Sequence, residues 1–142
     1  MTKNLYTRCK IDEFDAVVKP ALHDSNLLAL DLIKDKEIIL SFKLESGEFV
    51  KLYLDGVESF VCDNLRKGNI VLDFTITSGI DAKLENLQDF FDIPKRNNEK
   101  FNGYIDRLKQ KVIQNELVIV ELNPSYGCKL RALVESVHYE MV

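Results

Sequence analysis

The chain has 142 residues and a mass of 16.3 kDa, which is the size of one ordinary domain. Hydrophobic residues make up 46% of it and charged residues 30%, so a wholly disordered chain is excluded. The formal net charge of −4 argues against a protein whose main role is to coat nucleic acid or an anionic membrane. We expect a single globular domain over residues 1–142.

The amino terminus and the cysteines indicate a compartment. Residues 1–10 have no apolar core and no small-residue cleavage pattern, so they are not typical of a secretory signal. No uncharged apolar run is long enough to cross a bilayer. Cys9, Cys62 and Cys128 lie far apart and form no CxxC pair, which argues against a disulfide framework or a zinc site. We therefore expect a cytoplasmic protein without cofactor or metal, whose reduced thiols act as small buried hydrophobic side chains.

Alternating apolar and polar residues give the clearest pattern, in three runs at residues 28–32, 38–44 and 50–54. A period of two places one row of side chains on a core and the other near water. Short polar segments separate the runs, as in antiparallel strands joined by tight hairpins. The runs therefore predict a three-stranded meander. His23–Asn26, directly before it, is typical of a turn.

Four more apolar segments predict further strands. Residues 57–65 predict a short fourth strand or an edge segment, and residues 70–76 predict another strand with alternating side chains. Near the carboxyl end, residues 117–122 and 128–139 are apolar, and the segment between them, 123–127, is rich in turn-forming residues. We expect these last segments to form a closing hairpin.

Helical spacing between the two groups of strands predicts two helices. The first spans residues 78–94, with Ser78 and Asp81 in a capping box and Pro94 at its end. The second spans residues 101–112 and carries an apolar stripe. This order indicates an α+β domain with a largely antiparallel sheet, in which both helices pack on one face. The sheet would combine the meander of amino-terminal strands with the carboxy-terminal hairpin.

Residues that could carry catalysis are few. His23 lies beside Asp24, which could orient its ring, but no nucleophile or further metal ligand has a matching spacing. His138 falls in a predicted strand, and Cys62 has neither a specific base nor a helix amino terminus beside it. The glycines form no GxGxxG or GxxxxGK[ST] motif. We expect no catalytic residues and no enzymatic activity.

Four carboxylates line the polar face of the first predicted helix. Asp81, Glu85 and Asp89 are spaced by four residues, and Asp92 extends the row. Like charges at this spacing cost roughly a few tenths of a kcal/mol per pair. The row is either a solvated face or a docking surface for a basic partner. A nucleic-acid surface would instead need basic and aromatic residues gathered on one face, so we expect no nucleic-acid partner.

Three segments carry a resemblance to a known group of proteins: Leu22–Asn26, Leu52–Val57 and Gly68–Asp73. Over residues 22–76 the chain resembles small bacterial β-rich proteins, including immunity proteins of polymorphic toxin systems. The resemblance implies a β-rich fold and a protein that neutralises a cognate toxin by direct binding. Asp81, Glu85, Asp89 and Asp92 would then face a basic protein toxin. No catalytic residue carries over from the resemblance.

Two other classes of function remain open at this point. A small-molecule-binding or enzymatic domain would have a cavity in which polar groups such as His23, Asp24, Tyr53 or His138 converge. A self-associating structural module would use an exposed strand edge, for which Val57–Leu65 is the candidate.

Overall fold

The computed structural model describes residues 7–79, 82, 84, 87 and 99–142. No helix in these residues is long and apolar enough to span a membrane. The described elements, in chain order, are β1 (Thr7–Arg8), β2 (Lys10–Ile11), β3 (Val17–Lys19), β4 (Asn26–Ile33), β5 (Glu37–Lys43), β6 (Phe49–Asp55), β7 (Ser59–Asp63), β8 (Ile70–Thr77), α2 (Glu99–Ile113), β9 (Val118–Tyr126), β10 (Lys129–Val134) and β11 (Ser136–Met141).

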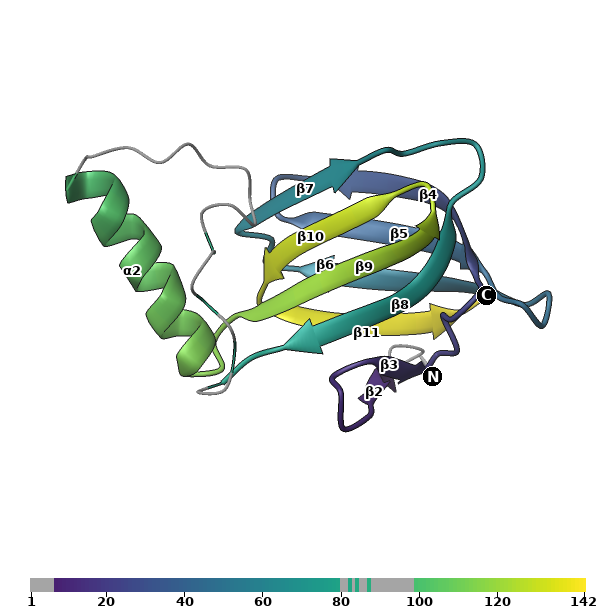
Figure 1. Ribbon diagram of the computed structural model, residues 1–142, viewed down its shortest axis with the longest axis horizontal. Helices are drawn as coiled ribbons and strands as arrows, with labels where there is room; N and C mark the ends of the chain where they lie inside the picture. Colours follow the sequence, from purple (N-terminus) through teal and green to yellow (C-terminus); the bar gives the residue numbers. More distant parts are fainter. Residues whose placement is uncertain (1–6, 80–81, 83, 85–86, 88–98) are drawn as a thin grey trace, which may run out of the picture.

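Nine strands form one antiparallel sheet, in the order β1-β11-β6-β5-β4-β8-β9-β10-β7. Figure 1 shows that this sheet is folded into two layers, with β7, β10, β9 and β8 in front and β4, β5, β6 and β11 behind. The predicted meander is confirmed as β4–β5–β6, and the predicted edge segment is confirmed as the edge strand β7. On one side the layers meet where β4 and β8 pair at Asn26 and Ile70.

On the other side the layers are joined by a bent two-stranded ribbon. β6 pairs with β11, and β7, which follows β6 in the chain, pairs with β10. The amide of Glu58 donates to Leu133 O (2.8 Å) and the amide of Glu135 donates to Asp55 O (2.9 Å), so pairing continues through the bend. Gly56 has φ +64°, and a Cβ there would lie 2.5 Å from the Glu135 side chain. Both features favour glycine at this corner.

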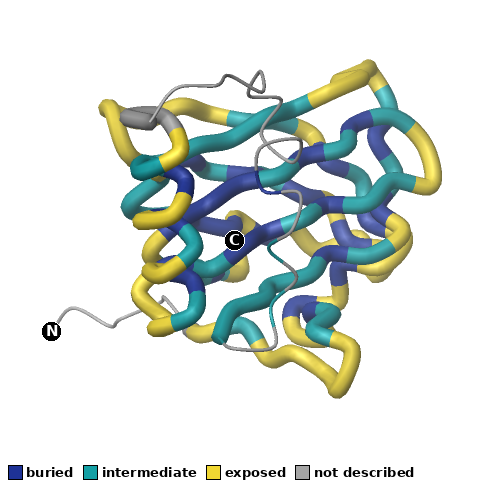
Figure 2. Tube along the Cα trace, turned by 60° about the vertical axis from the view of Figure 1, so that its left-hand side comes forward, coloured by how far each residue is buried: buried dark blue, intermediate teal, exposed yellow. Residues whose placement is uncertain are grey.

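The core fills the space between the two layers. Ile38, Leu40 and Phe42 alternate along β5 and are at most 1% exposed. Phe42 meets Phe74 of β8 edge to face, with ring centroids 6.4 Å apart, and so links the back layer to the front layer. Figure 2 shows the buried segments running through the strands, with exposed residues at the turns. Burial of one face of each strand therefore explains the period of two in the sequence.

Helix α2 confirms the second predicted helix and extends it by a few residues. Its apolar stripe, Ile105, Leu108 and Val112, is buried in a second cluster with Ile119 of β9 and Leu133 of β10. The helix thus packs against the ends of β9 and β10, at the left of Figure 1. The expected pair of helices is not matched, because the described residues contain this helix alone. Most of the first predicted helix, residues 78–94, lies outside the described residues.

The predicted closing hairpin is wrong in two details. β9 continues to Tyr126, through the segment predicted as a turn, and the chain reverses at Gly127. Pro124 is tolerated within the strand because it lies at a register shift against β8, where its missing N–H is not needed. The segment predicted as the last strand is divided at Glu135, where the chain passes from β10 in one layer to β11 in the other.

A bulge changes the predicted alternation in the first strand of the meander. The register of β4 against β5 shifts between Leu27 and Ala29. Leu27 is 1% exposed, whereas Leu28, expected in the core, is 51% exposed. An extra residue in one strand turns the following side chains to the other face, which hydrophobic alternation alone does not reveal.

The buried side chain of Asn69 holds three segments together. Its Oδ1 accepts hydrogen bonds from the amides of Arg66 (2.9 Å) and Cys128 (3.0 Å). Its Nδ2 donates to the carbonyls of Arg66 (2.7 Å) and Leu27 (3.3 Å). Asn69 is only 3% exposed, so these backbone groups depend on it rather than on water.

We expect Asn69→Ala to lower the free energy of unfolding by about 2–4 kcal/mol, because it leaves buried backbone donors and acceptors without partners. Urea unfolding followed by circular dichroism measures this loss. Asn102→Ala on the exposed surface of α2 is the matched control and should change stability by less than about 0.5 kcal/mol. Equal stability of the two variants would contradict the role assigned to Asn69.

Candidate binding site

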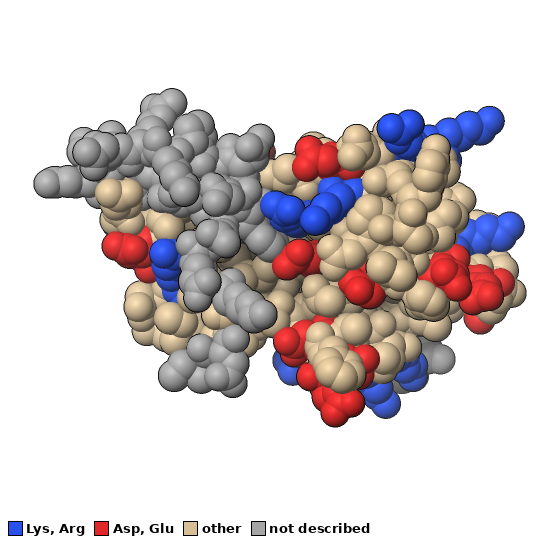
Figure 3. All heavy atoms as spheres, in the orientation of Figure 1, with Lys and Arg blue, Asp and Glu red and all other residues tan. Residues whose placement is uncertain are grey.

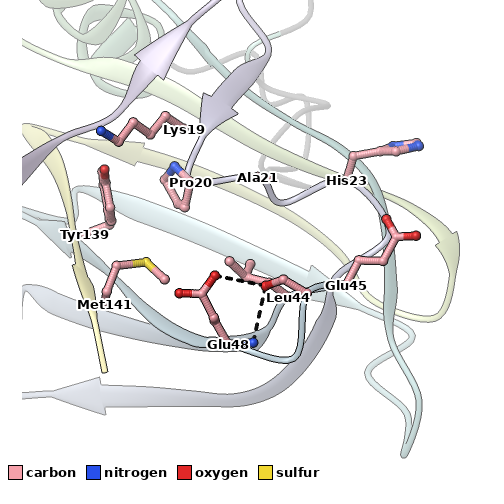
Figure 4. Close-up of a pocket in the computed structure, with 10 residues that line it drawn as sticks. Lys19, Pro20, Ala21, His23, Leu44, Glu45, Glu48, Tyr139 and Met141 are labelled. Carbon is pink, nitrogen blue, oxygen red and sulfur yellow. Dashed lines mark hydrogen bonds between the residues drawn. The ribbon is translucent and has the colours of Figure 1, made fainter.

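A pocket of about 660 Å³ opens at the end of the sandwich opposite α2. Three segments that are distant in the sequence form it: residues 19–23 after β3, the β5–β6 hairpin, and the end of β11. Figure 4 shows its lining residues, which are Lys19, Pro20, Ala21, His23, Leu44, Glu45, Ser46, Glu48, Tyr139 and Met141. Strands of the main sheet therefore supply two of the three walls.

The pocket combines an apolar floor with charged groups at its rim. Leu44 and Tyr139 belong to the core and are 8% and 5% exposed. The Ser46 hydroxyl donates to Glu48 Oε1 (3.1 Å), and the Glu48 amide donates to the same hydroxyl (3.3 Å), which orients the carboxylate. Figure 4 shows the Lys19 ammonium on the side of Tyr139, away from Glu48. Among the described residues, no ion pair joins Lys19 to Glu48.

His23 lies at the edge of the pocket, in the turn predicted from the sequence. Its Nδ1 is 2.6 Å from the carbonyl of Leu72, and its Nε2 is 3.4 Å from Asp24 Oδ2. The hydrogen bond to Leu72 raises the pKa of His23 above its ordinary value of 6.5, and the charges of Asp24 and Glu45 raise it further. His23 shares the rim of the pocket with Glu45, whose negative charge favours the protonated form of the ring.

This arrangement is suited to holding a group that has an apolar body and a charged end. The volume lies within the range of about 300–1,000 Å³ that is typical of small-ligand pockets. The Lys19 ammonium and the Glu48 carboxylate lie on different sides of the apolar floor. A cation would bind toward Glu48 and an anion toward Lys19.

A second polar cluster lies on the outer face of β6 and β11. The Tyr53 hydroxyl donates to Glu140 Oε2 (2.9 Å), and His138 Nε2 contacts Asp55 Oδ2. The Ser136 hydroxyl is 3.4 Å from the same nitrogen of His138. In a Ser-His-Asp triad the serine and the aspartate contact different ring nitrogens, so that the ring can pass a proton between them. The geometry of this cluster does not provide such a relay.

The residues predicted for a site fall into three groups in the structure. Asp81, Glu85, Asp89 and Asp92 lie outside the described residues. Four polar residues were suggested for a cavity. His23 lines the pocket, and Asp24 contacts the His23 ring. Tyr53 and His138 instead lie together on the outer face of the sheet.

Three residues that line the pocket were not predicted as site residues from the sequence: Lys19, Glu48 and Tyr139. The only local signal was the turn composition at residues 45–48, which marks the hairpin that carries Glu48. Lys19 and Tyr139 come together with it only through the topology of the sheet.

The surface shown in Figure 3 carries both signs of charge. On this face of the described residues, basic and acidic side chains are interspersed, and neither sign forms a continuous patch. No group of three His, Cys, Asp or Glu side chains among the described residues is placed to hold a metal ion. The pocket, which joins apolar and charged residues from three segments, is therefore the candidate site.

No family model, curated protein or solved structure matches this chain. The resemblance of residues 22–76 to immunity proteins thus stays a prediction from the sequence.

The raised pKa of His23 predicts a pH dependence of stability. Because the folded pKa lies above 6.5, the protonated ring contributes stability that is fully present below pH 6.5 and is lost as the pH rises through the folded pKa. NMR titration of the ring measures that pKa. We expect Asp24→Asn to lower it toward 6.5, while asparagine keeps the positive φ of the turn. A wild-type pKa at or below 6.5 would contradict this assignment.

Proposed function

We propose that this chain is a non-enzymatic binding protein of the cytoplasm, and that the pocket at the end of the sandwich is where it holds its partner. The observation that carries this proposal is the combination of an apolar floor with an oriented carboxylate, Glu48, at the rim. Leu44 and Glu48 lie in the short turn between β5 and β6, and Tyr139 lies on β11, so little conformational order has to be gained on binding.

The partner that fits this pocket presents a basic side chain. The aliphatic part of a lysine or arginine would pack on Leu44 and Met141, and its charged end would reach Glu48. Lys19 lies on the other side of the floor and would repel the cation, which favours one orientation over the reverse. The pocket would therefore select both the charge and the direction of the inserted side chain.

Neutralisation of a basic bacterial toxin is the specific form of this proposal. Its support is the resemblance of residues 22–76 to immunity proteins, together with the fit of a basic side chain to the pocket. The predicted acidic row, Asp81, Glu85, Asp89 and Asp92, would offer a second, separate contact to a basic surface. Direct binding that covers a surface needs no chemistry from this chain.

The chemistry of the pocket can be tested with small probes. We expect n-butylammonium, which imitates a lysine side chain, to shift the NMR amide signals of Leu44, Glu48 and Met141 more than butanoate does. Glu48→Gln should weaken this binding about 2- to 5-fold, as expected for one exposed charge pair. Glu116→Gln removes the same charge at an exposed site beyond α2 and should leave the binding unchanged. Equal effects of the two variants would contradict the role of Glu48.

Neutralisation can be tested by co-expression with a candidate toxin encoded beside the gene for this chain. Wild-type protein and Glu116→Lys should restore bacterial growth, whereas Glu48→Lys should not, because it places a second cation at the pocket. The double variant Glu85→Lys with Asp89→Lys tests the acidic row in the same assay. Growth without any of these proteins, or rescue by all of them alike, would overturn the proposal.

A further inference from the structure

Two cysteines that are 66 positions apart in the sequence meet inside the sandwich. The Sγ atoms of Cys62 and Cys128 are 2.9 Å apart. Cys128 is fully buried, and Cys62 is partly buried against the same core. A disulfide has an S–S length of about 2.05 Å, so less than about 1 Å of movement separates this thiol pair from a covalent bond. The sequence, which shows three scattered cysteines, gave no sign of this pair.

The position of the two thiols is fixed by the surrounding backbone. In the β7–β10 pairing Cys62 lies opposite Leu130, two residues beyond Cys128. The amide of Cys128 is held by Asn69 Oδ1 (3.0 Å). Residues with positive φ adjoin this region, Asn64 (φ 59°) after β7 and Gly127 (φ 88°) before Cys128. The backbone thus holds the two Sγ atoms 2.9 Å apart, and bond formation has to close less than about 1 Å.

We propose that Cys62 and Cys128 form a reversible disulfide, for which a low-molecular-weight disulfide such as glutathione disulfide is the oxidant. The Cys62 thiolate attacks one sulfur of the oxidant, a mixed disulfide forms, and one glutathione leaves as a thiolate. The Cys128 thiol then loses its proton and attacks Cys62 Sγ, which releases the second glutathione. The protein gives up two electrons and two protons, and the oxidant becomes two thiols.

The surroundings of the two thiols indicate that Cys62 attacks the oxidant first and that Cys128 attacks second. The hydrogen bond with Cys128 lowers the pKa of Cys62, although burial and the charge of Asp63 oppose this effect. The same hydrogen bond, together with burial, raises the pKa of Cys128. Cys62 is thus the thiol that ionises first, and it is also the less buried of the two. Burial raises the pKa of Cys9 to about 12, so that third thiol is a poor competitor.

The disulfide would tie the edge strand β7 to the turn between β9 and β10. β7 pairs on one side only, with β10. A cross-link between segments so far apart in the sequence restricts the unfolded chain and stabilises the folded one. Oxidation would therefore raise the melting temperature and reduce local opening of β7.

The test is to incubate the purified protein with glutathione disulfide and then count thiols and measure the intact mass. We expect wild-type protein to lose two of its three thiols without a retained glutathione, and dithiothreitol to restore them. Peptide mapping should find Cys62 linked to Cys128. Cys9→Ser should form the same link and so serves as the matched control.

Single variants separate the two roles. Cys128→Ser should retain one glutathione on Cys62, because the attacking thiol is missing, whereas Cys62→Ser should leave Cys128 reduced. The peptide map of the wild-type protein decides the matter even if a variant fails to fold. Three thiols retained in the wild type, or glutathione left on Cys62 with Cys128 present, would overturn the proposal.

Discussion

The architecture depends on the corner at which the ribbon of β6–β7 and β10–β11 bends from one layer to the other. The amides of Glu58 and Glu135 continue the ladder across the bend, and Gly56 provides the backbone conformation that the bend requires. Without this bend the two halves of the sheet would expose the apolar faces that Phe42 and Phe74 now bury against each other. Hydrophobic burial drives the folding of the sheet, and the corner determines where it turns.

The corner also positions both candidate sites. β11 leaves it and runs toward the end of the sandwich, where Tyr139 and Met141 meet the β5–β6 hairpin and complete the pocket. β7 leaves it in the front layer and brings Cys62 beside Cys128. Helix α2 packs against the strands at the other end of the molecule, away from the pocket. The positions of both candidate sites thus follow from one backbone geometry.

Local pattern was enough to predict much of the fold. Alternation identified the meander, and helical spacing identified α2, because each reflects the burial of one face of one element. The bulge beside Leu28 and the strand that continues through Pro124 were not predictable, since both depend on the neighbouring strand. The pocket was not predictable either, because Lys19, Glu48 and Tyr139 are joined only by long-range strand pairing. The pair Cys62 and Cys128 was not predictable for the same reason, because strand pairing brings the two thiols together.

Native-state hydrogen exchange at the corner tests this account most directly. The amide of Glu58 donates to Leu133 O (2.8 Å) and that of Glu135 donates to Asp55 O (2.9 Å). If the ribbon is continuous, both amides should exchange only through global unfolding, with the same protection as the amide of Leu40 in the centre of β5. Exchange at Glu58 and Glu135 that is orders of magnitude faster than at Leu40 would show that the corner opens independently, and would contradict the account.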